Sequence, residues 1–198
     1  MADVKGDLAV KNTLDVTNNA KFRKGVDQPY FEIVDQKDPA ILGGGAAGQD
    51  FVARDLTTVI HNDFATATTL ASTSGDGGDF TLPAGVYHIE ASAPAFNVGG
   101  HIARLADTTT LPSATAPTVV LGTSENSIRV DGTPAGEEST QTRSQVVGRF
   151  TLSSSTKLEL QHKTEFDDLT CGFGAGSAFY TVDNVYTTVR IWQIRNDA

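Results

Sequence analysis

Carboxylates are the side chains of this sequence whose type and spacing come nearest to catalytic chemistry. Glu137 and Glu138 are adjacent, and Glu165 precedes the pair Asp167 and Asp168. Glycoside hydrolysis needs two carboxylates held about 5–9.5 Å apart. The neighbours of both groups are typical of solvated loops, where tuning of a carboxyl pKa is weak. The sequence therefore favours binding over cleavage, and a glycan-degrading enzyme is the alternative.

Histidine is the other side chain suited to acid–base chemistry, and the chain has His61, His88, His101 and His162. No Gly-x-Ser-x-Gly element accompanies them, which is the usual setting of a serine nucleophile. His88 lies two residues before Glu90 and fits the surface or a subunit interface. His162 ends an apolar strand face and fits the core or an axis between subunits. We therefore expect no enzymatic activity.

Metal and cofactor sites are not indicated by the sequence either. Cys171 is the single cysteine, so no intrachain disulfide can form, and no spacing of His and Cys fits zinc. The glycine-rich segments 43–48 and 172–176 lack the strand–helix context of a phosphate-binding loop, and we interpret them as linker and tight turn. Segment 76–79 has two aspartates in a glycine turn without the residue order of a calcium loop; plain turn chemistry or a structural cation explains it. The sequence predicts no cofactor and no metal ligand.

Side chains suited to recognition gather in segments that we expect to be loops. Segment 164–170 mixes an aromatic ring with polar groups, as sugar-binding surfaces do. Segments 97–101 and 124–131 are further candidates, because binding residues commonly lie in loops on a rigid β frame. The alternative for Phe166 is a hydrophobic plug that anchors its loop. The receptor-binding candidates are Glu165, Phe166, Asp167, Asp168, Asn97 and His101.

The elements that would position these loops are short strands separated by turn-forming clusters. Many short strands at this spacing are typical of a β-sandwich or jelly roll. No segment has a convincing amphipathic helical pattern. The expected strands are 51–60, 80–82, 86–93, 101–105, 118–122, 145–152, 156–162, 177–182 and 185–194.

Alternation along two of these strands indicates which faces are buried. In segment 86–91, Tyr87 and every second residue share the face that we expect in the core. In segment 185–194 both faces carry apolar groups, with Val189 on one and Trp192 on the other. A strand of this kind is covered on both sides, so the sequence predicts a subunit interface over its outer face.

Composition limits the partners and the setting. The 198 residues carry a formal net charge of −9, which opposes nucleic-acid binding because phosphate contacts need basic patches. No apolar run is long enough to span a membrane, so we expect no membrane insertion. The first residues lack the plan of a secretory signal, and we expect assembly in a cytoplasm.

The first 26 residues repeat an apolar-x-apolar pattern every six positions. The two apolar positions are occupied by Leu8, Leu14 and Ala20 and by Val10, Val16 and Phe22. Strand units this short cannot bury their own apolar face and must stack on copies or on other chains. We interpret residues 1–26 as an intertwined β stalk built from several chains, with an ordinary hairpin or a frayed terminus as the alternative. A stalk indicates a fibre.

Between stalk and head the sequence predicts a connector. Residues 27–50 contain Pro29 and Pro39, which interrupt regular structure, and the flexible glycine run. Within them, segment 30–34 is a short strand that would cap the stalk. Residues 51–198 then form the head.

Two resemblances add to this interpretation. Segment 79–89, with Phe80, Pro83, Gly85 and Tyr87, resembles the signature of C1q/TNF-type jelly rolls, and segment 58–62 resembles the strand that precedes it. Across roughly residues 35–195 the chain is similar to a family of bacteriophage fibre C-terminal domains. The matching segments are 35–37, 53–56, 91–95, 101–105, 122–125, 147–150, 160–162 and 185–192. The loop 133–138 departs from that pattern.

The second resemblance implies a homotrimeric knob on a virion fibre, either a tail fibre or a head spike. Its knob would bind a host surface polysaccharide or protein receptor, and its N-terminus would attach to another virion protein. The expected fold is all-β, an N-terminal intertwined β-repeat stalk followed by a C1q/TNF-like jelly-roll sandwich. A secreted or cellular C1q-like adaptor is the alternative outside virions.

Overall fold

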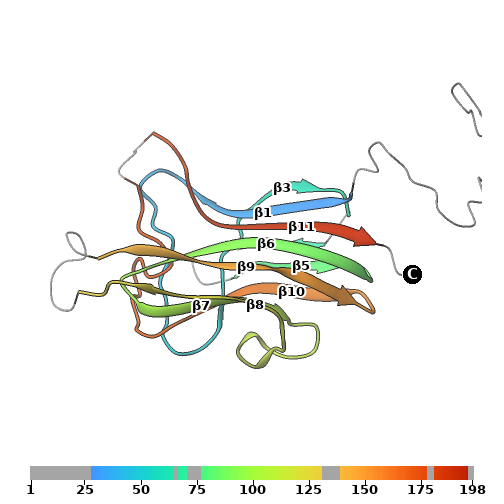
Figure 1. Ribbon diagram of the computed structural model, residues 1–198. Coiled ribbons are helices and arrows are strands. Elements are labelled where there is room, and N and C mark those ends of the chain that lie inside the picture. The colour runs from blue at the N-terminus through green and yellow to red at the C-terminus, as the bar shows by residue number, and fades with distance from the viewer. Residues whose placement is uncertain (1–27, 65–66, 71–76, 131–138, 178–180, 196–198) are drawn as a thin grey trace, which may run out of the picture.

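Two antiparallel sheets face each other in the computed structural model, which describes residues 28–64, 67–70, 77–130, 139–177 and 181–195 (Figure 1). The expected stalk, with Leu8, Val10, Leu14, Val16 and Phe22, lies outside the described residues. Within them the only helical element is a short 3₁₀ turn, η1 (Ser113–Thr115). No helix among them is long and apolar enough to cross a membrane. The prediction of an all-β sandwich is confirmed.

The first sheet has the order β3-β1-β11-β6-β9. Its strands are β1 (Tyr30–Lys37), β3 (Thr58–Asn62), β6 (Gly85–Phe96), β9 (Gln141–Leu152) and β11 (Asn184–Arg195). The second sheet has the order β4-β5-β10-β7-β8, and β2 pairs with β10 beside it. Its strands are β2 (Val52–Ala53), β4 (Thr68–Thr69), β5 (Asp79–Leu82), β7 (Gly99–Asp107), β8 (Thr118–Ser127) and β10 (Thr156–Thr164).

The chain crosses between the sheets at almost every connection. From β5 it passes to β6 in the first sheet, returns for β7 and β8, crosses to β9, returns for β10 and ends in β11. Neighbours in each sheet are therefore mostly distant in sequence, which is the jelly-roll arrangement. The strand order is therefore that of the jelly roll that the resemblance of segment 79–89 implies.

The apolar core lies between the sheets and follows the predicted alternation. Tyr87 and Ile89 are fully buried and Ala91 is nearly so. Tyr87 enters this core with a polar tip, and its hydroxyl donates to the carbonyl of Pro83 across a 2.8 Å hydrogen bond. Burial of such side chains is the main stabilising contribution to a sandwich of this size.

Two strand predictions were wrong in part. The expected strand 51–60 is two strands, because the chain changes sheets there. β2 pairs with β10 in the second sheet, whereas β3 pairs with β1 in the first. In the expected strand 177–182, Ser177, Thr181 and Val182 lie outside any strand. The amide and hydroxyl of Ser177 instead donate to Asn184 Oδ1.

The strand expected at 30–34 exists and extends to Lys37 as β1. It occupies part of the segment interpreted as connector, where it lies between β3 and β11 as an internal strand of the first sheet. Tyr30, at its start, pairs with Trp192 near the end of β11. The two ends of the described chain therefore leave the sandwich at the same end (Figure 1). We call the opposite end, which carries the turn between β6 and β7 and the loop after β10, the tip.

Candidate functional site

Backbone hydrogen bonds join three loops at the tip. The amide of Glu165 donates to Gly100 O over 2.7 Å, and the amide of Phe166 donates to Val98 O over 3.0 Å. Ala46 and Asp168 exchange two backbone hydrogen bonds of 2.7 and 3.0 Å. The glycine run 43–48, interpreted from sequence as a flexible linker, is thus a fixed part of the tip. That interpretation missed these contacts because their partners lie more than 100 residues away.

Glycine is required where the β6–β7 turn meets the loop after β10. Gly99 has φ +70°, in the left-handed region that side chains disfavour. A Cβ there would lie 2.7 Å from Glu165 Oε2 and 2.8 Å from the ring of Phe166. The absence of a side chain therefore allows the two loops to pack against each other.

Asn97 holds the β6–β7 turn to its neighbours. It has φ 58°, a left-handed conformation that asparagine tolerates better than most residues. Its Nδ2 donates to Asp168 Oδ2 over 3.2 Å, and its Oδ1 accepts from the amide of Val130 and the hydroxyl of Ser139, each over 3.0 Å. Asn97 therefore connects the three candidate loops, and its contact with a receptor stays a prediction.

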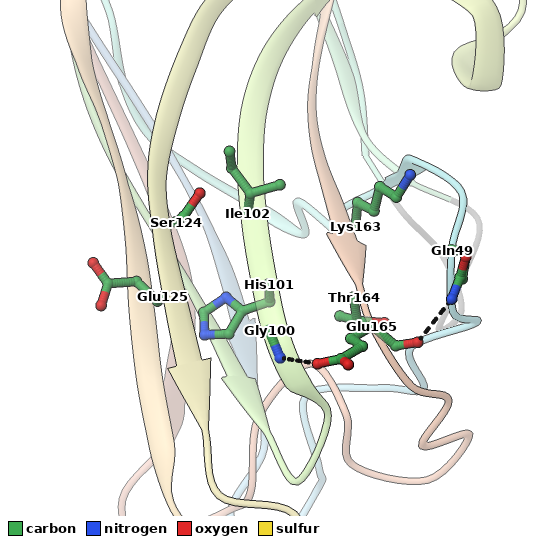
Figure 2. Close-up of a pocket in the computed structure, with 9 residues that line it drawn as sticks. All are labelled: Gln49, Gly100, His101, Ile102, Ser124, Glu125, Lys163, Thr164 and Glu165. Atoms are coloured by element: carbon green, nitrogen blue, oxygen red, sulfur yellow. Dashed lines mark hydrogen bonds between the residues drawn. The ribbon is translucent and has the colours of Figure 1, made fainter.

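Beside these loops the outer face of the second sheet is hollowed (Figure 2). The hollow has a volume of about 390 Å³. The neighbouring strands β8, β7 and β10 form its floor, and Gln49, which directly follows the glycine run, forms one wall. Its lining residues are Gln49, Gly100, His101, Ile102, Ser124, Glu125, Lys163, Thr164 and Glu165. All three candidate segments of the sequence analysis contribute to it.

The lining suits a polar or hydroxylated ligand. Glu165 offers a carboxylate acceptor, Lys163 offers an ammonium donor, and the amide of Gln49 offers both, whereas the carboxylate of Glu125 points away from these three (Figure 2). Glu165 Oε2 accepts from the amide of Gly100 over 2.9 Å, and Gln49 Nε2 donates to the carbonyl of Glu165 over 3.5 Å (Figure 2). These contacts fix the wall of the hollow before any ligand arrives.

Phe166 follows Glu165 in the loop after β10 and is not one of the residues that line the hollow. Its side chain is 40% exposed. The guanidinium of Arg129 lies 4.2 Å from the ring centroid, in a cation–π arrangement. Exposure to this degree fits the loop expected for segment 164–170, and the exposed part of a ring held in this way is a surface for stacking.

The other two acids of segment 164–170 differ in role. Asp167 is exposed and Asp168 is half-buried. Burial opposes ionisation of Asp168, but hydrogen bonds from the amide of Cys171, from Asn97 and from the amide of Thr170 outweigh it and lower its pKa. The carboxylate of Asp168 therefore accepts hydrogen bonds from the loop backbone and holds the loop in place within the protein.

His101 is buried, with 4% of its surface exposed, and only borders the hollow. Its Nδ1 lies 2.9 Å from Nε2 of the fully buried His162, and its Nε2 lies 2.7 Å from the hydroxyl of Thr142. Burial lowers the pKa of His101 to about 4 and that of His162 well below the ordinary value. Both rings are neutral at physiological pH. His162 lies in the core of the subunit, which is one of the two positions expected for it.

A fully buried arginine, Arg54, forms hydrogen bonds with the segments that lead into the tip loops. Arg54 donates to the hydroxyl of Thr187 and to the carbonyls of Pro94 and Phe173. Its guanidinium lies 4.1 Å from the ring centroid of Phe173, which in turn stacks on His162. The sequence analysis did not select Arg54, because no local pattern distinguishes an arginine between two sheets from a surface one.

The outer face of the first sheet carries a second distinctive surface, which we call the aromatic face. Tyr30, Trp192, His88 and Arg149 are paired side by side across β1, β11, β6 and β9. Ring centroids are 5.2 Å apart for Tyr30 and Trp192 and 5.9 Å apart for Trp192 and His88. His61 extends the row, 5.7 Å from Tyr30. The apolar outer side predicted for the last strand is thus centred on Trp192.

Charges on the aromatic face are balanced, unlike those of the chain as a whole. Its acids are Glu32, Asp63 and Glu90, and its bases are Arg143, Arg149 and Arg190. The Nε of Arg190 donates to Glu32 Oε1 over 2.8 Å. The full chain has a net charge of −9. This face can therefore approach a copy of itself with less repulsion than the remaining surface.

Comparison with known proteins finds similar structures but no similar sequences. No family model and no curated protein matches the chain. Similar solved structures include the globular domain of zebrafish complement 1qA protein, with 15% identity over 86% of this chain and 100% of that chain and a TM-score of 0.46. Murine APRIL at pH 8.0 has 9% identity over 84% of this chain and 99% of that chain, with a TM-score of 0.43.

Proposed function

We propose that this chain is a virion fibre protein whose homotrimeric head binds a host surface polysaccharide or protein receptor without cleaving it. The convergence of the three candidate loops on one hollow at the tip is the observation that carries the receptor-binding role. The virion setting rests on the sequence resemblance to phage fibre heads. The proposal covers both a tail fibre and a head spike.

The position of the tip supports this role. Tyr30 and Trp192 pair at the end where the described chain enters and leaves. A stalk that precedes β1 and attaches to another virion protein would therefore hold the tip outermost. Each tip can bind weakly, because many heads on one particle raise avidity by about 10²–10⁴.

The chemistry of the tip supports binding without cleavage. A general acid for glycoside hydrolysis needs a raised pKa, whereas the pKa of Asp168 is lowered. Glu165 is bound to the amide of Gly100. Carboxylates held in this way are suited to accept hydrogen bonds from sugar hydroxyls.

The aromatic face supports self-assembly. Trp, Tyr and Arg are the residues enriched where protein interfaces have most of their binding energy, and all three lie in its central row. Trp192 and His88 are only half-buried within one subunit. Contact with a neighbouring copy would complete their burial, as predicted from the apolar outer side of the last strand.

Two matched variants separate binding from assembly. Phe166→Ala alters the tip, and we expect it to abolish most binding to host cells or to an array of bacterial surface glycans while sedimentation shows an unchanged trimer. Trp192→Ala alters the aromatic face, and we expect it to shift sedimentation towards monomer. A stable wild-type monomer would refute the trimer. Release of oligosaccharides from host polysaccharide would replace the binding role with an enzymatic one.

The virion setting has its own test. Antibody against this chain, visualised by electron microscopy on particles, should label the outer ends of fibres or spikes. Labelling of an extracellular complex of the host in place of particles would favour the C1q-like adaptor.

A further inference from the structure

One lysine and two aspartates meet at the tip end of β1, between the two sheets. Nζ of Lys37 lies 2.7 Å from Oδ2 of Asp55 and 3.4 Å from Oδ1 of Asp35. Lys37 ends β1 in the first sheet, and Asp55 follows β2, which pairs with the second sheet. The three groups are therefore brought together by tertiary structure.

These groups are removed from water. The side chain of Lys37 is 10% exposed, that of Asp55 5% and that of Asp35 fully buried. Neither carboxylate oxygen of Asp35 has a hydrogen-bond partner. Asp35 lies where the pairing of β1 with β11 shifts register, between Val34 and Gln36. A buried carboxyl without hydrogen bonds is costly as a structural device and calls for a further explanation.

We propose that Lys37 and Asp55 form an intramolecular isopeptide bond and that Asp35 promotes its formation. The amine nitrogen and the Asp55 carboxyl are already in contact, and the carbon to be attacked is one C–O bond from the contacted oxygen. Amine and carboxyl groups held together in this way react as an intramolecular pair, without the entropy cost of bringing them together. No co-reactant is needed.

The step balances within the three side chains. Asp35 takes one proton from the Lys37 ammonium, and the neutral amine attacks Cγ of Asp55. A new N–C bond forms, and Asp35 returns the proton to the departing oxygen of Asp55. That C–O bond breaks, a second proton leaves the nitrogen, and the oxygen departs as water with both protons. One positive and one negative charge disappear from the interior, and Asp35 ends as it began.

The environment of Asp35 suits this role. Burial raises its pKa to about 6, against the opposing influence of Lys37 and Arg54. A carboxyl with such a pKa exchanges protons readily near neutral pH, as a general acid–base group must. The low-dielectric surroundings also favour the loss of an ion pair in exchange for a neutral amide.

The cross-link would join the two sheets directly beneath the tip. It would close the loop from Asp38 to Arg54, which includes Gln49 of the hollow, and would restrain that loop in the unfolded chain as a disulfide does. Cys171 is the single cysteine of the sequence, so no intrachain disulfide can restrain this loop. The inference is independent of the function proposed above.

Mass spectrometry of the intact full-length chain is the test. We expect the folded wild type to be lighter than its sequence by one water molecule and Lys37→Arg, which keeps the positive charge, to have its full mass. Trypsin should fail to cleave after Lys37 in the wild type and should release a branched peptide that contains Lys37 and Asp55. A full-mass wild type would overturn the proposal, and so would a water loss that persists in Lys37→Arg or maps to an Asp-Gly sequence.

The role of Asp35 has a separate readout. We expect Asp35→Ala to retain the β-type circular dichroism of the wild type and to keep its full mass after prolonged incubation at neutral pH. A folded Asp35→Ala chain that lost water as completely as the wild type would refute the promoting role. Asp55→Ala is the matched control, because it removes the carbon that is attacked.

Discussion

Nδ1 of His101 lies 2.9 Å from Nε2 of His162, and these two neutral imidazoles join β7 to β10 inside the sandwich. Nδ1 of His162 has no hydrogen-bond partner. A lone pair without a partner costs less than an N–H without one. The arrangement of protons that fits is therefore Nε2–H of His162 donating to Nδ1 of His101, and Nε2–H of His101 donating to Thr142.

This pair predicts loss of stability in acid. The folded pKa values of both histidines lie below the unfolded value of about 6.5. Between about pH 6.5 and 4 the unfolded chain therefore binds more protons, so the free energy of unfolding falls as pH falls. The nearby charges do not reverse this, because Arg54 lowers both pKa values and Glu125 raises only that of His101. Thermal unfolding followed by circular dichroism from pH 7.5 to 4.5 measures the effect.

Replacement of one ring isolates the contribution of the pair. His101→Gln removes a titrating group, and we expect a lower melting temperature at pH 7 but a weaker dependence on pH between 6.5 and 4. An unchanged pH dependence would contradict the assignment to these histidines.

Asp35 is predicted to act in the opposite direction. Its folded pKa of about 6 lies above the ordinary value, so the folded chain binds more protons between about pH 4 and 6 and gains stability from Asp35 as pH falls. Asp35→Asn removes this compensation, and we expect its loss of stability in acid to be steeper than that of the wild type. The comparison uses the same circular dichroism measurement.

Asn97 is predicted to hold the tip loops together. Asn97→Ala removes three hydrogen bonds and places alanine at positive φ, so we expect a loss of about 2–3 kcal/mol in the free energy of unfolding. Asn97→Gly loses the same hydrogen bonds without the backbone strain and should be less destabilised. Urea unfolding of the two variants gives both values, and equal losses would argue against strain.

Adjacent glycines at the tip form a matched pair. Gly99→Ala places a methyl group against Glu165 and Phe166, whereas a Cβ at Gly100 has its nearest contact at 3.4 Å and Gly100 lacks a positive φ. We expect Gly99→Ala to lower the free energy of unfolding and to impair receptor binding as Phe166→Ala does, and Gly100→Ala to keep the stability of the wild type. Urea unfolding of both variants and cell-binding titrations with Gly99→Ala measure this, and equal stabilities would show that packing at Gly99 does not position the loop after β10.

Arg54 is predicted to be the most costly single replacement. Arg54→Met keeps much of the volume but leaves the hydroxyl of Thr187 and the carbonyls of Pro94 and Phe173 without this donor, and it removes a positive charge near Asp35. Loss of one partner in a buried charged group costs about 3–5 kcal/mol. Chemical unfolding should show this loss, and a decrease below 1 kcal/mol would indicate that Arg54 is not needed to satisfy the interior.

Sequence reasoning succeeded where the pattern is local. Period-two alternation identified the buried face that contains Tyr87, because a strand places successive side chains on opposite sides whatever surrounds it. The apolar outer side of Trp192 was found in the same way. Segment 164–170 was selected from composition alone, and the exposure of Phe166 agrees with that selection.

Its failures occur where partners are distant in the chain. The break between β2 and β3 follows from pairing with two different sheets, which the residues of segment 51–60 do not encode by themselves. His101 was selected as a receptor-binding candidate, but it is buried against His162, which is 61 residues away in the chain. The fixed geometry of the glycine run likewise depends on Asp168.

The amino-acid sequence by itself determined the all-β character of the head, the faces of its strands and the composition of the tip loops, because these depend on periodicity and on residue type over a few positions. Only the tertiary structure decided that Gln49, Glu125 and Glu165 border one hollow and that Lys37 meets Asp55 between the sheets. Those proximities arise from jelly-roll crossovers, which bring together residues that no local pattern connects.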